Sequence, residues 1–159
     1  MIEMMAPAAA LHRTERLYSI LALERRAAAA LADLMADLGD QLLQIHDEIL
    51  AEGGVWRDWL ALAAREAGSR GLRPISERSA RQYMALARFR RTSGERFPHF
   101  MHLDIACLYP ILSLPEPVLE EFESKGVPTA SGERVPIADA SSRQVAWAVD
   151  PAQRAAHAR

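Results

Sequence analysis

Residues 56–91 read WRDWLALAAREAGSRGLRPISERSARQYMALARFRR, and this stretch determines the predicted fold. Apolar residues recur at helical spacing in its first third, two glycines follow, and Ser76 then precedes a second helical pattern rich in arginine. Serine is a favoured N-cap because its hydroxyl oxygen accepts from the free N–H groups of the first helical turn. The order of helix, glycine-containing turn and capped helix predicts a helix-turn-helix unit.

The second predicted helix, from Ser76 to about Phe89, has two chemically different sides. Its inner side is small and apolar, and consists of Ala80, Tyr83, Met84 and Ala87. Its outer side is polar, and includes Arg78, Arg81, Gln82 and Arg88. In a helix-turn-helix protein the second helix lies in the DNA major groove and presents its first turns to the bases.

The early outer side chains match the edges of bases. Arginine suits guanine and glutamine suits adenine, so Arg78, Arg81 and Gln82 are the predicted readers. Glu77 is expected either to accept from cytosine or to repel the DNA backbone. The predicted phosphate contacts are Arg88, Arg90 and Arg91, together with Arg65 and the loop residues Arg70 and Arg73, although the loop pair would equally suit a solvated surface.

Charge is distributed unevenly along the chain, although the net charge is only −2. Residues 53–96 carry +6, whereas residues 1–52 carry −5 and residues 97–159 carry −3. Binding to phosphates needs positive charge concentrated in this way. The pattern favours double-stranded DNA as a partner, but the same arginines would also suit a solvated helix face or ion pairs with the acidic N-terminal helix.

From Leu11 to about Glu52 the sequence predicts one long helix, weakened only at Gly39. Two apolar series within it repeat every seven residues, as in a coiled coil. One is Leu17, Leu31, Leu38 and Ile45, interrupted by Glu24, and the other is Leu21, Ala28, Met35, Leu42 and Ile49. The helix is expected either to form a homodimer or to pack on its own domain. The predicted dimer contacts are Leu31, Met35, Leu38, Leu42, Ile45 and Ile49.

The remaining segments complete an all-α prediction: a long heptad helix over 11–52 and a helix-turn-helix-like core over 53–150 with short C-terminal helices. Residues 1–10 and 151–159 are expected to be a disordered leader and tail. Ser113 and Glu116 have capping-box spacing before a helix that ends at Gly126. Residues 127–136 are predicted to be a flexible loop, and a helix near 139–149 is expected to dock Trp147 on the core.

This pattern resembles a family of phage, plasmid and mobile-element proteins from proteobacteria. The similar motifs are GVWRDWL at 54–60, SERSARQYMALA at 76–87, and LYPIL at 108–112 followed by Pro115 and Glu116. The resemblance implies a long N-terminal helix, a helix-turn-helix-like domain and a mobile-element setting. The GSRGLR segment at 68–73 departs from the family pattern because it lengthens the turn.

Catalytic and metal-binding patterns are weak in this sequence. His99, His102, Asp104 and Cys107 lie close together, but they lack the spacing of CxxC or HExxH motifs. We therefore expect no catalytic site, no metal, no cofactor and no enzymatic activity. The single cysteine excludes an internal disulfide and fits the reducing cytoplasm, and no apolar run has the length of a membrane span.

The leading prediction is a DNA-binding regulator or segregation factor of a phage or mobile element, acting as a cytoplasmic dimer. The alternative is a non-enzymatic protein-binding module, such as a phage-encoded inhibitor or adaptor of a host complex, which would use the N-terminal helix. RNA binding is a third and weaker alternative, because the sequence contains no aromatic strand platform.

Overall fold

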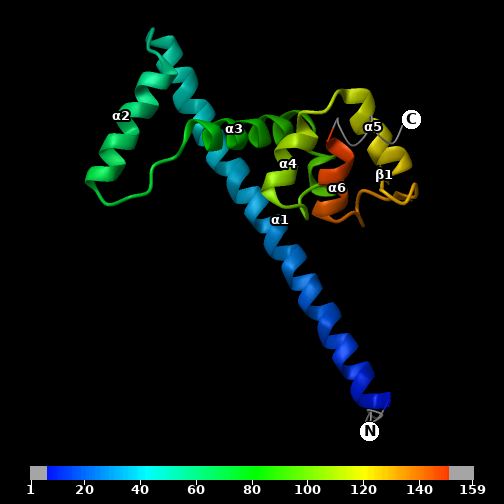
Figure 1. The fold of residues 1–159 in the computed structure, drawn as a ribbon. Helices are drawn as coiled ribbons and strands as arrows, with labels where there is room; N and C mark the ends of the chain where they lie inside the picture. Colours follow the sequence, from blue (N-terminus) through cyan, green and yellow to red (C-terminus); the bar gives the residue numbers. More distant parts are fainter. Residues whose placement is uncertain (1–6, 151–159) are drawn as a thin grey trace.

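The computed structural model describes residues 7–150, with side chains from Leu11 onward, and confirms an all-α fold (Figure 1). The predicted disordered leader over 1–10 is wrong for residues 7–10, which form the start of α1. Residues 1–6 and the predicted tail over 151–159 lie outside the described residues. The elements are α1 (Pro7–Ala51), α2 (Trp56–Ser69), α3 (Glu77–Thr92), η1 (Phe97–His99), α4 (Ile105–Leu112), α5 (Glu116–Lys125), β1 (Val127–Pro128), β2 (Arg134–Val135) and α6 (Ser142–Val149). Among the helices of this part of the chain, none has both the length and the apolar character needed to cross a membrane.

The long N-terminal helix is confirmed, and it begins at Pro7, earlier than predicted. Proline is tolerated there because the first-turn N–H groups of a helix have no partner within the helix. Every side chain of residues 11–27 is exposed. We call this segment the arm, and Figure 1 shows it extending far beyond the other helices.

The main neighbour of α1 is α3, which crosses its C-terminal half (Figure 1). The crossing is close because Gly39 has no side chain. A Cβ atom built on Gly39 would lie 1.9 Å from the carbonyl oxygen of Tyr83 and 2.9 Å from the Cβ atom of Ala87. Gly39, which the sequence marks as the weak position of the long helix, is therefore the point where the backbones of α1 and α3 meet.

Two apolar clusters hold the helices together. The main cluster joins α1 and α3 to α4, α5, α6 and the short strands, and Phe100, Leu108 and Ile111 are fully buried in it. Trp147 is half-buried against this cluster, as predicted. The second cluster joins α1, α2 and α3, and consists of Leu42, Leu43, Leu60, Ala80, Met84 and Ala87, with Trp56, Trp59 and Tyr83 packed against it.

The helix α2 extends to Ser69, so Gly68 lies inside it and the connection to α3 is residues 70–76. This connection is longer than the tight turn of a standard helix-turn-helix, as the inserted segment predicts. The helix α3 takes most of its support from α1. In Figure 1, α2 folds back beside the C-terminal end of α1 and the connection then returns to α3.

Two predictions for the C-terminal part are wrong. Ser113 ends α4 with helical φ and ψ angles, and its hydroxyl donates to the carbonyl oxygen of Tyr109 at 2.8 Å, so it cannot cap α5. An N-cap needs an extended backbone, and the capping box is found instead at Ser141 and Gln144, before α6.

The second wrong prediction is the flexible loop over residues 127–136. Val127 pairs with Val135, and Pro128 pairs with Arg134, in a short antiparallel ribbon. Gly126, which ends α5 as predicted, has a φ of 86°, and a Cβ atom there would lie 2.7 Å from the carbonyl oxygen of Val135. The glycine thus allows the chain to turn directly from the helix into the ribbon.

Candidate nucleic-acid interface

The start of α3 is fixed by the predicted cap. The side chain of Ser76 accepts a hydrogen bond from the backbone N–H of Ser79 at 3.1 Å. Glu77 lies in the first turn, where its negative charge is favourable to the helix dipole. The beginning of α3, whose first two turns carry the predicted base readers, is therefore held in a defined conformation.

The inner side of α3 is buried as predicted. Ala80 and Ala87 are fully buried, Met84 is 4% exposed and Tyr83 is half-buried. Leu86 is also fully buried, against the main cluster, which the inner-side pattern did not predict. Between residues 78 and 90, packing on two adjacent sides leaves only a narrow strip of α3 fully exposed.

That exposed strip carries three of the predicted DNA contacts. Arg78, Arg81 and Arg88 are all exposed, and their spacing of three and seven residues places them along one line of the helix. We call them the arginine row. Gln82 lies next to the row and is half-buried. The structure therefore brings Arg78, Arg81 and Arg88 together and leaves Gln82 less accessible.

Glu77 organises the start of the arginine row. Its carboxylate forms ion pairs with Arg81, four residues later, and with Arg57 of α2 at 3.4 Å. The hydrogen bond from Arg81 and the charge of Arg57 lower the pKa of Glu77 below its ordinary value, against a smaller opposing effect of burial. Glu77 is thus ionised near neutral pH and binds one end of the Arg81 guanidinium. The other N–H groups of this guanidinium can still donate hydrogen bonds to a ligand.

Most of the positive excess of residues 53–96 is neutralised within the chain. Six of its ten arginines form ion pairs: Arg57, Arg70, Arg81, Arg90, Arg91 and Arg96. Within residues 7–150, the other four form no ion pair, and they are Arg65, Arg73, Arg78 and Arg88. The net charge of the segment therefore overstates the charge available to a phosphate backbone.

Arg90 is the centre of the largest of these ion-pair networks. Its guanidinium contacts carboxylate oxygens of Asp33 at 3.3 Å, Asp37 at 2.7 Å and Asp40 at 2.8 Å. Partial burial disfavours its charge, but the three carboxylates outweigh that effect and raise the pKa of Arg90. Arg91 also pairs with Asp40, at 2.6 Å. Both arginines fasten α3 to α1 through these ion pairs.

The two predicted loop contacts have different surroundings. Arg70 lies at the C-terminal end of α2 and pairs with Glu66 at 2.6 Å. Arg73 is exposed in the connection between α2 and α3, where it lines a small apolar cavity with Leu72 and Pro74. Of the two, Arg73 is the more available for a phosphate.

Tyr109 lies beside the arginine row, which the sequence does not predict. This α4 residue lines a shallow hollow of about 370 Å³ together with Glu77, Arg78 and Arg81. Its position follows from the packing of α4 against α3. No local signal in the sequence relates Tyr109 to a helix that begins 32 residues before it.

The predicted dimer contacts divide into three groups by their exposure. Leu42 is only 6% exposed, because α2 and α3 of the same chain cover it, so its assignment to a dimer contact is corrected. Met35, Ile45 and Ile49 are half-buried within the chain. Leu31 and Leu38 remain exposed, at 44% and 39%.

Two members of the cluster near His99, His102 and Cys107, each have a partner of their own outside the cluster. His102 Nε2 lies 3.1 Å from the carbonyl oxygen of Ala140, and the thiol of Cys107 donates to the carbonyl oxygen of Ser142 at 3.3 Å. Burial lowers the pKa of His102 and raises that of Cys107. In residues 7–150 there is no group of three or more His, Cys, Asp or Glu side chains placed to hold a metal ion.

The features that point to a ligand are thus an exposed arginine row on a capped helix and a long exposed arm. Comparison of the chain with protein-family models, curated proteins and solved structures finds no match.

Proposed function

We propose that this protein is a non-enzymatic, DNA-binding regulator or segregation factor of a mobile element, and that α3 is its DNA-contacting helix. The observation that carries the proposal is the arginine row, which lies on the exposed side of α3, whereas the other residues from 79 to 90 are buried or half-buried. A helix held in this way loses little conformational entropy when it meets a rigid ligand. The mobile-element setting rests on the sequence resemblance alone.

The arginine row suits a duplex because it combines phosphate and base contacts. Arg78 and Arg88 lie ten residues apart on α3, or about 15 Å, so they can reach separate phosphates along one groove. Arg81 lies between them, and its pairing with Glu77 restricts the guanidinium while leaving donors for a guanine edge. We expect Tyr109 and Arg73 to add polar contacts to the phosphate backbone of the DNA.

The strength of phosphate binding is tested by removing the two unpaired members of the row. Arg78→Ala with Arg88→Ala should reduce the affinity for a duplex of two helical turns, measured by fluorescence anisotropy between about 50 and 200 mM salt. The slope of log K against log salt should fall by about two, since each phosphate contact contributes about one. Unchanged affinity and slope would remove α3 from the interface.

The matched control removes two arginines elsewhere. Arg65 of α2, a phosphate contact in the sequence prediction but not in the α3 interface proposed here, and Arg143 of α6 are also exposed and form no ion pair within residues 7–150. Arg65→Ala with Arg143→Ala changes the net charge by the same amount, so it should leave the affinity and slope close to those of the unaltered protein. A loss equal to that of the α3 variant would indicate general attraction of charge and no defined interface.

Sequence reading is tested separately. Selection from random duplexes should enrich a motif for the unaltered protein. Arg81→Ala with Gln82→Ala should lose this motif but keep most of the general affinity, because base contacts specify and phosphate contacts position. The same motif from both proteins would exclude Arg81 and Gln82 as readers.

One observation favours the second candidate, a protein-binding module that uses α1. The arm presents large apolar side chains to solvent, including Leu11, Tyr18 and Leu23. Contiguous exposed apolar surface commonly marks a protein interaction site. A protein that binds no DNA at low salt, yet forms a stable complex with a host or phage protein through α1, would support this candidate over DNA binding.

A further inference from the structure

Between residues 17 and 38, the α1 helix carries an apolar stripe, and every member of this stripe is exposed. Its members alternate in steps of three and four residues, and they are Leu17, Ile20, Ala27, Leu31, Leu34 and Leu38, with Glu24 at the one remaining position. The exposed fraction of the five large side chains runs from 39% at Leu38 to 60% at Leu34. This spacing is that of the contact seam in a two-stranded coiled coil. The residues that α1 buries against α3, such as Ala32, Ala36 and Gly39, lie on a different side.

We propose that a second copy of this chain covers the stripe, with the two α1 helices antiparallel. In this pairing Leu17 of one copy lies opposite Leu34 of the other, and Ile20 lies opposite Leu31. Each chain supplies both members of every pair, so the contact repeats itself about a two-fold axis near Arg25 and Arg26. This proposal concerns the arm and does not rest on DNA binding.

The side-chain sizes along the stripe favour the antiparallel register. Glu24 is the only charged member, and Ala27 is the only small one. The antiparallel pairing places them opposite each other, so the carboxylate has room to turn to solvent beside a methyl group. A parallel pairing in register would place the two Glu24 carboxylates face to face, where both would lose solvation.

The charges beside the stripe also favour this orientation. Residues 11–26 contain four arginines and two glutamates, whereas residues 33–52 contain six acidic residues and no lysine or arginine. Antiparallel helices bring the positive segment of each copy beside the negative segment of the other. Arg16 would flank Asp37, whose side chain is 60% exposed although it already contacts Arg90. Parallel helices would place like charges together.

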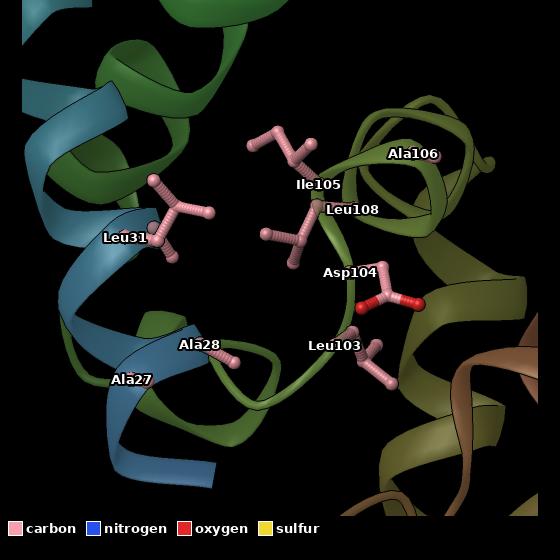
Figure 2. A pocket seen from close by; sticks show the side chains of 9 residues that line it. Ala27, Ala28, Leu31, Leu103, Asp104, Ile105, Ala106 and Leu108 are labelled. Carbon is pink, nitrogen blue, oxygen red and sulfur yellow. The ribbon is translucent and has the colours of Figure 1, made fainter. Parts of the chain in front are cut away.

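A groove beside the stripe gives the second copy additional contact. It has a volume of about 490 Å³. Its lining on α1 is Ala27, Ala28, Leu31 and Ala32, and its lining on the other side is residues 103–106 and Leu108. Figure 2 shows Leu31 facing Ile105 and Leu108 across the opening, while the carboxylate of Asp104 points away from it. Leu21 is 48% exposed, and the register brings Leu21 of the second copy beside Ala28 at the edge of this groove.

The oligomeric state of the full chain is the first test. Sedimentation equilibrium should give a dimer for the unaltered protein, and Leu31→Glu should raise the dimer dissociation constant by at least about 100-fold, since the change acts in two symmetric layers. Leu62→Glu is the matched control, because Leu62 is 56% exposed on α2 and lies away from the stripe. It should remain dimeric. A chain that is monomeric at every concentration, or that responds equally to both changes, overturns the proposal.

Orientation is tested by cross-linking in a Cys107→Ser background, which removes the natural thiol. Leu17→Cys and Leu34→Cys chains should form a mixed cross-linked dimer when combined, and neither should cross-link to itself. Self-cross-linking of Leu17→Cys alone would show a parallel pair and overturn the register. Circular dichroism of each variant should match that of the unaltered chain, because the substituted positions are exposed. Protection of the stripe by an unrelated protein, with no dimer, would also contradict the inference.

Discussion

Gly39 and Tyr83 bring the backbones of α1 and α3 into direct contact, since a Cβ atom at Gly39 would lie 1.9 Å from the Tyr83 carbonyl oxygen. No alanine fits there unless the two helices separate. Separation would open the second apolar cluster, in which Ala80, Met84 and Ala87 are buried. The position of the arginine row therefore depends on a glycine of the N-terminal helix.

Gly39→Ala should consequently lower the free energy of unfolding by about 1–3 kcal/mol, the usual cost of overpacking. Urea denaturation followed by circular dichroism measures this change. Gly68→Ala is the control, because Gly68 lies inside α2 with nothing within 4 Å of an added Cβ atom. It should stabilise the protein by about 0.5–1 kcal/mol through the better helix propensity of alanine. Equal effects of the two changes would contradict a close contact at Gly39.

Arg90→Ala should destabilise the protein by about 1–3 kcal/mol, because it leaves the carboxylates of Asp33, Asp37 and Asp40 close together without their shared cation. Arg88→Ala removes the same charge from the exposed face of α3 and should change stability by less than about 0.5 kcal/mol. Urea midpoints of the two variants provide the comparison. If they were alike, the network around Arg90 would contribute nothing to the fold.

The stability of the protein should fall as the pH decreases below about 6.5. Burial lowers the pKa of His102 in the folded chain, although its hydrogen bond to Ala140 partly opposes this effect. As the pH falls, His102 therefore binds a proton in the unfolded chain before it does so in the folded chain. The stability that His102 contributes is complete above the pKa of the unfolded chain, and it is lost as the pH falls from there toward the lower pKa of the folded chain. Thermal unfolding between about pH 7.5 and 5.5 should show a shallower pH dependence for His102→Gln. Parallel curves for both proteins would contradict this assignment.

Ser141→Ala should cost about 1 kcal/mol, since Ser141 and Gln144 form the capping box of α6. Ser113→Ala should cost less than about 0.5 kcal/mol, because the hydroxyl of Ser113 only donates to the Tyr109 carbonyl oxygen on an exposed surface. Chemical denaturation of the two variants tests the relocation of the capping box directly. A larger loss at Ser113 would restore the original prediction.

These two serines illustrate what local sequence can predict. The long helix, the Ser76 cap and the inner side of α3 were predictable, because each depends on residues within a few positions of one another. Ser113 and Ser141 both have a cap-like pattern, but Ser113 belongs to the last turn of α4, and only the extent of that helix distinguishes them.

The availability of the arginines was not predictable from local sequence. Arg90 pairs with aspartates 50 to 57 residues earlier, and Arg96 pairs with Glu123, which is 27 residues later. Such pairs depend on how α1 crosses α3 and how α5 packs beside η1. Counting charges along a segment therefore identified the basic region but not which of its cations are free to meet a ligand.

The position of Gly39 on α1 has a consequence for the proposed antiparallel pair. Its two-fold axis lies near Arg25 and Arg26, so the two Gly39 crossings are separated along the helices by about 40 Å, from the helical rise per residue. One turn of B-DNA spans about 34–36 Å. The distance along α1 from the two-fold axis to Gly39 would then determine how far apart the two α3 helices lie. That separation would set the spacing of the two DNA half-sites that one dimer can occupy at the same time.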